Sequence, residues 1–341
     1  MVLIKTVLEG ASLRYSLAVV VMACVGCGSV APSSVAPGVL PTPTPAPSPT
    51  ATPAPTPTPS PAPLRFSYTG RVIETLTGIP VTGATVTSGA ISVQSESGGA
   101  FSLDLSVSSA RITVSAPGYL TRETTITTGR DVAVDIIHDA PPFSLVFYRQ
   151  MARNTWEGGT ALQLYVLPVA PAFYLQTKGL TSENISALAQ TTRSMVAAFT
   201  GGRFAVTTFE TGVETRAVRA GWIVIELIHD AAEWWCGKAL VGATAGHIWM
   251  NTAHDACLVR GSLDEGVLSH EIGHALGFWH LDFQNALMHS DFELDHRTIT
   301  AGERYHASIA YKRFPGNRDI DVDANNVGPR SVTTEPVLIV D

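Results

Sequence analysis

The sequence predicts a multidomain protein in which a small all-β sandwich is followed by a mixed α/β (α+β) domain. Two patterns carry this prediction. Short segments with alternating apolar and polar residues fill 64–139, whereas strand-like and helix-like patterns alternate in 140–315. A Pro/Thr-rich linker at 28–63 separates these domains from residues 1–27, and a polar tail covers 316–341.

The composition fits folded domains. Of the 341 residues, 45% are hydrophobic and 15% are charged, which is enough apolar material for two cores. The formal net charge is −7 and Lys and Arg form no run. We therefore expect no nucleic-acid partner, because such binding needs a concentrated positive surface.

Residues 1–27 have the anatomy of a secretory signal peptide. Lys5 and Arg14 precede an apolar run at 17–23 that is too short to span a bilayer. The run ends at Cys24 and resembles a bacterial lipobox, with Cys27 as a second candidate for lipidation. An ordinary cleaved signal is the alternative. We expect an exported protein that is lipid-anchored in the bacterial cell envelope and faces outward, or is secreted.

The linker at 28–63 consists almost entirely of Pro, Thr, Ala and Ser after its first residues. Such a composition buries no core and favours polyproline II, in which it would reach roughly 70 to 100 Å. We expect a stalk.

The 64–139 segment reads as a β-sandwich. Phe101, Leu103 and Leu105 alternate with polar residues, so one face of that strand is buried. The run G-R-V-I-E-T-L-T-G-I-P-V-T-G-A-T-V at 70–86 resembles carboxypeptidase-regulatory-like modules found beside secreted enzymes. The resemblance implies a spacer or binding module.

The 140–315 segment contains both kinds of element. Helical periodicity predicts a helix at 181–199, which Ser182 can cap, and a last helix at 300–312. A further helix begins near 262. Apolar runs predict strands at 161–169, 204–209, 222–228 and 246–251.

Cys236 and Cys257 are the only cysteines after the signal region. In an exported chain, one pair within a domain predicts a disulfide, and two buried thiols are the alternative.

The candidate chemistry lies between 269 and 289. His270 and His274 are four apart, so a helix places them on one face, with Glu271 beside them. Gly277 can end that helix in a left-handed conformation and let His280 return as a third ligand. Three imidazoles with an open fourth position are typical of catalytic zinc, which is preferred over iron or manganese because no carboxylate is included.

This stretch, S-H-E-I-G-H-A-L-G-F-W-H, resembles the metzincin signature, and Met288 lies where the matrixin branch has its Met-turn. The resemblance implies a metzincin-like zinc protease domain and a zinc metalloendopeptidase, a hydrolase of peptide bonds. Glu271 would be its general base and acid.

The resemblance also implies a substrate site. In that family an extended peptide pairs with an edge strand above the cleft, and the matching residues are Gly246, His247, Ile248 and Trp249. Matrixins also carry Ca²⁺ or a second Zn²⁺ near that strand. The candidates for such a site are His229, Asp230, His247, His254 and Asp255.

Two functional classes follow. One is a zinc endopeptidase at the bacterial cell surface that acts on proteins or peptides. The other is a surface adhesin or binding protein that uses the β-sandwich, with the protease fold as a platform. Retention of Glu271 favours the enzyme, because a platform has no use for a carboxylate beside the metal.

Overall fold

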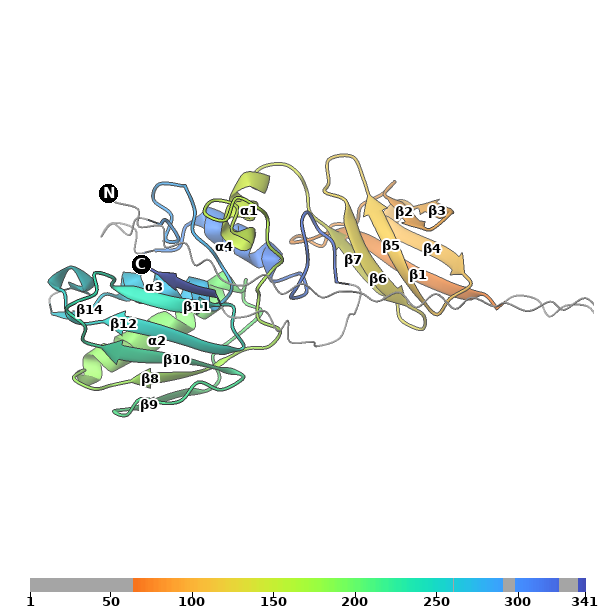
Figure 1. Cartoon of the computed structure of the whole chain (residues 1–341). Helices are drawn as coiled ribbons and strands as arrows, with labels where there is room; N and C mark the ends of the chain where they lie inside the picture. The colour runs from red at the N-terminus through yellow and green to blue at the C-terminus, as the bar shows by residue number, and fades with distance from the viewer. Residues whose placement is uncertain (1–63, 260, 291–297, 325–336) are drawn as a thin grey trace, which may run out of the picture. The chain divides into compact units, whose positions relative to one another are not determined.

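The computed structural model describes residues 64–259, 261–290, 298–324 and 337–341, as drawn in Figure 1. The predicted signal, both lipidation candidates and the linker lie outside these ranges. Within them, no helix combines the length and apolar composition needed to cross a membrane. The structure is a mixed one, with several sheets and few helices.

Residues 66–136 form two sheets around one apolar core. One sheet has the strand order β4-β1-β7 and the other β3-β2-β5-β6. Phe101, Leu103 and Leu105 face this core, in agreement with the alternation in the sequence. The strands are β1 (Phe66–Glu74), β2 (Thr85–Ser88), β3 (Ile91–Gln94), β4 (Ala100–Leu105), β5 (Ser109–Ser115), β6 (Arg122–Thr127) and β7 (Val132–Ile136), with a short 3-10 turn at Ser97–Gly99.

The rest of the chain is built on a six-stranded mixed sheet with the order β15-β11-β12-β10-β8-β9. Strands β9, β8, β10 and β12 run parallel, while β11 and β15 are antiparallel to their neighbours. The bounds are β8 (Ala172–Gln176), β9 (Phe209–Gly212), β10 (Trp222–Ile228), β11 (Gly237–Val241), β12 (Ala245–Asn251) and β15 (Val337–Val340). A 3-10 turn (Asp255–Cys257) and a small hairpin, β13 (Leu258–Val259) and β14 (Ser262–Leu263), follow β12.

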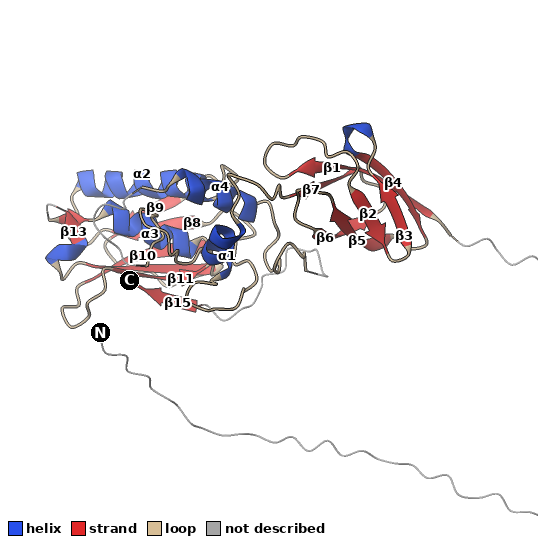
Figure 2. Cartoon of the chain, turned by 90° about the horizontal axis from the view of Figure 1, so that it is seen from above, coloured by secondary structure: helices blue, strands red, loops and turns tan. Residues whose placement is uncertain are grey.

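Helices cover one face of this sheet, as Figure 2 shows for α2 and α3. They are α1 (Leu145–Arg153), α2 (Ser182–Phe199), α3 (Glu265–Ala275) and α4 (Ala301–Ala310). Ile225 and Ile248 of the sheet share a core with Leu188 of α2 and Ile272 of α3. Each of these side chains is at most 2% exposed, so the layers fix α3 firmly.

The helix starts follow from side-chain caps. In α2, Thr181 accepts from the backbone N–H of Asn184 and the Asn184 side chain reaches back, a capping box. Thr181 is therefore the cap, and the prediction of Ser182 is off by one residue. Thr300 and Glu303 form a second capping box at the start of α4.

Other expectations are wrong. The strand expected at 204–209 begins only at Phe209, as β9. The apolar run at 161–169 forms no strand, and Leu164 and Val166 are instead buried in the main apolar core. Helix α1 and strand β11 were not expected. The segment 316–341 was expected to be a polar tail, yet Asn317 is buried and accepts from Arg153 at 2.7 Å, and β15 joins the sheet.

Candidate metal centre

Helix α3 carries the first two histidines. Asp264 caps it by accepting from the backbone N–H of Gly266 at 2.7 Å, which starts the helix three residues later than the sequence suggests. The four-residue spacing places the imidazoles of His270 and His274 on one face of the helix, and their Nε2 atoms lie 2.9 Å apart. Both side chains are almost completely buried.

A sharp turn brings the third histidine back. Gly277 has a φ of 102°, and a Cβ there would press on the backbone of Tyr165. The chain then reverses and the N–H of Trp279 donates to the carbonyl of Met151 at 2.7 Å. Nε2 of His280 arrives 3.3 Å from that of His270 and 3.1 Å from that of His274. The structure thus brings together the three histidines that the spacing singled out.

The outer ring nitrogens of the three histidines all have hydrogen-bond partners, and two of these partners are backbone carbonyls. Nδ1 of His270 lies 2.6 Å from the carbonyl of Leu287, and Nδ1 of His274 lies 2.8 Å from that of Phe278. A carbonyl oxygen only accepts, so each Nδ1 carries the proton and each Nε2 presents a lone pair. Nδ1 of His280 likewise faces Oε1 of Glu157 at 2.7 Å.

These contacts favour a cation. The Nε2 atoms of the three histidines converge within 3.3 Å of one another, and imidazole nitrogens in this arrangement can bind one positive ion together. The separations also suit nitrogen ligands about 2.0 to 2.1 Å from one zinc ion. The residues therefore fit a metal, and Glu157, Leu287 and Phe278 supply the outer hydrogen bonds that orient metal-binding imidazoles.

A fourth group completes the centre, and the sequence analysis missed it. Oδ1 of Asp341 lies 2.7 Å from Nε2 of His280, and Oδ2 lies 3.3 Å from that of His274 and 3.6 Å from that of His270. His270, His274, His280 and Asp341 are the one group in the described part of the chain whose atoms could jointly hold a metal. No local signal marks Asp341, because it is 61 residues beyond His280.

Glu271 lies beside the histidines and is completely buried. Within the described residues, neither of its carboxylate oxygens makes a hydrogen bond, although Asp341 is close enough to interact with it. Burial raises the pKa of Glu271 well above its usual range, and the negative charge of Asp341 raises it further. A buried carboxyl group with a raised pKa, next to a metal site, is suited to handling a proton.

The same surroundings separate the pKa values of the ligands. Burial lowers the pKa of His274 to about 4. Burial also acts to lower the pKa of His280, but its contacts with Asp341 and Glu157 outweigh this and raise it to about 9. The histidines hold the pKa of Asp341 well below its usual range, against the effect of burial.

Met288 lies under the histidine-bearing helix. Its side chain is fully buried, and a Cβ at Gly273 of α3 would overlap its sulfur. Its backbone is held on both sides, since its N–H donates to Glu303 at 2.8 Å and its carbonyl accepts from Leu281 at 2.8 Å. The adjacent Leu287 carbonyl is the one that orients His270.

The expected substrate-binding strand is not an edge strand. Gly246, His247, Ile248 and Trp249 lie in β12, which pairs with β10 on one side and β11 on the other. Its main-chain groups are used in both ladders, so no peptide can add to it. His247 instead lies 2.9 Å from Glu226 and stacks on Trp249. The strand beyond it, β11, is the one that reaches the metal centre.

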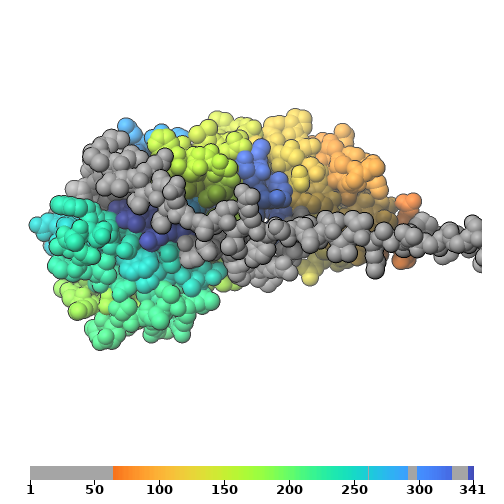
Figure 3. Space-filling view, in the orientation of Figure 1, coloured from red at the N-terminus to blue at the C-terminus, as the bar shows by residue number. Residues whose placement is uncertain are grey.

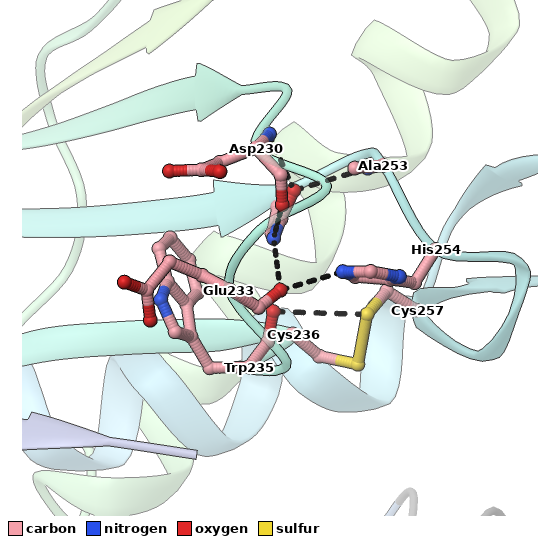
Figure 4. Close-up of a disulfide and its surroundings, with 8 residues drawn as sticks. Asp230, Glu233, Trp235, Cys236, Ala253, His254 and Cys257 are labelled. Atoms are coloured by element: carbon pink, nitrogen blue, oxygen red, sulfur yellow. Dashed lines mark hydrogen bonds between the residues drawn. A yellow bond between two sulfur atoms is a disulfide. The ribbon is translucent and has the colours of Figure 1, made fainter.

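Cys236 and Cys257 form a disulfide that ties the start of β11 to the turn after β12 (Figure 4). The candidates for a second metal surround it but do not converge. His254 lies 2.5 Å from the carbonyl of Glu233 and its ring stacks on Trp234. The others, His229, Asp230, His247 and Asp255, form no metal-binding group in the ranges that the structure describes.

Comparisons with known proteins give little further guidance. No family model matches the chain, and no curated protein matches it. Metalloproteinase-II from Bacteroides fragilis is a distant structural neighbour, with 13% identity, a TM-score of 0.30, and coverage of 72% of this chain and 85% of that one. A B. fragilis protein of unknown function matches at 22% identity and a TM-score of 0.18, over 22% of this chain and only 28% of its own length. Neither likeness is close enough to carry an argument.

Proposed function

We propose that this protein is a zinc-dependent endopeptidase. The observation that carries the proposal is the convergence of three histidine Nε2 atoms next to the buried carboxyl group of Glu271. His270, His274 and His280 would hold the ion. Zinc held in this way lowers the pKa of water and polarises a carbonyl group, which is the chemistry that peptide hydrolysis needs.

Glu271 would act as the general base and general acid. Its carboxylate would accept a proton from the attacking water and deliver it to the amine that leaves, a role that fits a buried carboxyl group beside the ligands. His270 and His274 keep their lone pairs because backbone carbonyls hold the Nδ1 protons. Both of these histidines and Glu271 are buried beside the apolar core, which would limit the access of other water.

The experiment compares Glu271→Gln with the matched control Glu183→Gln, which changes an exposed residue of α2. Zinc-loaded proteins are incubated with a peptide mixture with and without a chelator. Because Asp341 touches the site, each variant is also made with Asp341→Ala. We expect chelator-sensitive cleavage that falls at least about a hundredfold in Glu271→Gln at unchanged zinc content. Equal cleavage by the two variants would refute the assignment of the base.

The proposal extends to the family. The signature at 270–280, the positive φ of Gly277 and the buried Met288 support a matrixin-like metzincin domain. The two-sheet unit at 66–136 would be a carboxypeptidase-regulatory-like module beside the enzyme.

We also propose an outward-facing, lipid-anchored location, which rests on the N-terminal sequence alone. Lipidation of Cys24 or Cys27 predicts that a chain with both replaced by Ser leaves the membrane fraction. Retention of that variant in the membrane would exclude the anchor.

A further inference from the structure

The segment 337–341 lies alongside β11, the strand that reaches the metal centre. Strand β15 pairs antiparallel with β11, from Val337 opposite Val241 to Val340 opposite Lys238. The ladder continues to Asp341, whose N–H donates to the carbonyl of Gly237 at 3.0 Å and whose backbone oxygen accepts from the N–H of Cys236 at 2.7 Å. Without this segment, the outer side of β11 would be a free edge, as an incoming peptide requires.

Side chains along the segment alternate between buried and exposed positions. Ile339 is 9% exposed and packs with Val241 and Trp279, whereas Leu338 and Val340 are about half exposed. The indigo atoms of this strand are partly visible at the surface in Figure 3. Asp341 continues the inward-facing set, which places its carboxylate, 6% exposed, against the three histidines.

This carboxylate lies where the reaction would take place. It is within 3.6 Å of all three Nε2 atoms, so it takes the position that a three-histidine zinc site leaves for water. The main chain beside it pairs with Gly237, the residue that packs against Glu271. One segment therefore covers both the strand edge and the fourth ligand position.

We propose that residues 337–341 are an inhibitory segment, with Asp341 as the fourth metal ligand, that blocks the peptide site until the segment is displaced. The inference rests on the proposed zinc endopeptidase. A segment on the same chain acts at an effective concentration of about millimolar, so peptides at micromolar concentration compete poorly with it. Displacement would free the edge of β11 and the fourth position together.

The first experiment needs no catalysis. A chain that lacks residues 337–341 and carries Glu271→Gln is loaded with zinc and titrated with a fluorescein-labelled, C-terminally amidated peptide V-L-I-V-D, with polarisation as the readout. The amide removes a terminal carboxylate that could bind in place of the Asp side chain. We expect saturable binding that a chelator abolishes and that weakens at least about tenfold for V-L-I-V-N. No binding, or equal binding of both peptides with and without chelator, would overturn the proposal.

The second experiment keeps the strand in place, in case the deletion disturbs folding. Cobalt(II) is substituted into the full chain, into Asp341→Ala, and into the matched control Asp104→Ala, an exposed position on β4. Loss of an oxygen ligand should change the visible absorption of cobalt in Asp341→Ala only, and the zinc form of that variant should cleave peptides about 10- to 100-fold faster. Identical spectra and rates would exclude inhibition by Asp341.

The two readouts also separate this inference from the proposed function. Metal-dependent peptide binding without cleavage by any variant would support binding of residues 337–341 at the metal centre and refute the endopeptidase activity. Cleavage at equal rates by the full chain and Asp341→Ala would support the endopeptidase activity and refute inhibition by residues 337–341.

Discussion

Gly237 of β11 lies directly against the carboxylate of Glu271, and a Cβ at this position would overlap Oε1. The first residue of this strand thus forms a wall of the metal centre, and the absence of a side chain there sets the position of the proposed base. The relationship joins two residues that are 34 apart in the sequence.

The variant Gly237→Ala should therefore move Glu271 without removing it. A displacement of about 1 Å in a catalytic group costs up to roughly a hundredfold in rate, so we expect kcat to fall 10- to 100-fold at unchanged zinc content. Measurement of kcat and bound zinc tests this. Gly302→Ala is the control, because a Cβ there would meet Phe147 at an ordinary 3.6 Å. Equal rates for both variants would show that Gly237 does not position the base.

Removal of the Glu157 carboxylate should weaken metal binding. Glu157 accepts a hydrogen bond from Nδ1 of His280 at 2.7 Å, and this bond lowers the pKa of Glu157. Such outer-shell carboxylates typically contribute 10- to 100-fold to metal affinity. We expect Glu157→Ala to raise the dissociation constant for zinc by about that factor in a competition with a chelator. The exposed residue Glu183 serves as the control, and an equal affinity in Glu183→Ala and Glu157→Ala would refute the role.

The stability of the metal-free protein should pass through a maximum with pH. The folded pKa of His274, about 4, is below its unfolded value of about 6.5, so the unfolded state binds more protons and stability falls as pH drops below about 6.5. The folded pKa of His280, about 9, is above its unfolded value, so its contribution is complete below about pH 6.5 and is lost as pH rises toward 9.

Urea unfolding of the metal-free chain at pH 4.5, 6.5 and 9 tests these two windows. The two residues together predict the highest free energy of unfolding near pH 6.5. In Asp341→Ala, the free energy of unfolding should fall less between pH 6.5 and 9, because Asp341 is among the groups that raise the pKa of His280. A free energy of unfolding that rises steadily up to pH 9 would contradict the prediction.

Loss of the disulfide should destabilise the domain. The bond between Cys236 and Cys257 closes a loop with a sequence separation of 21 residues. The loop-entropy model gives about 3 kcal/mol for a loop of this size, so the double Cys→Ser variant should lose roughly 2 to 4 kcal/mol of unfolding free energy. Denaturation in urea with and without reductant measures it. If reduction lowers the stability of the parent chain and leaves the double variant unchanged, the effect belongs to this bond.

Much of the metal centre could be predicted from the sequence because its three histidines lie within eleven residues of chain. His270 and His274 are one helical turn apart, and Gly277 places the reversal that returns His280. The strand at 222–228 could also be predicted, since Ile223, Val224 and Ile225 form an apolar run that is buried on both faces of the sheet.

Other features had no local signal. The run at 161–169 is as apolar as a strand, but it is buried as irregular chain in the main core. An apolar run does not distinguish a strand from other buried chain. Strand β12 matched a family pattern, yet its neighbours decide whether it is an edge. Pairing partners are set by contacts between distant segments, which a single sequence does not display.

The sequence by itself determined which side chains can bind the ion, because a helix and a glycine turn act over a few residues. Only the tertiary structure decided what faces those side chains. Gly237, Glu157 and Asp341 reach the centre from three separate segments, each held there by strand pairing or side-chain hydrogen bonds. Such long-range placement follows from the packing of the whole sheet, since no local periodicity encodes it.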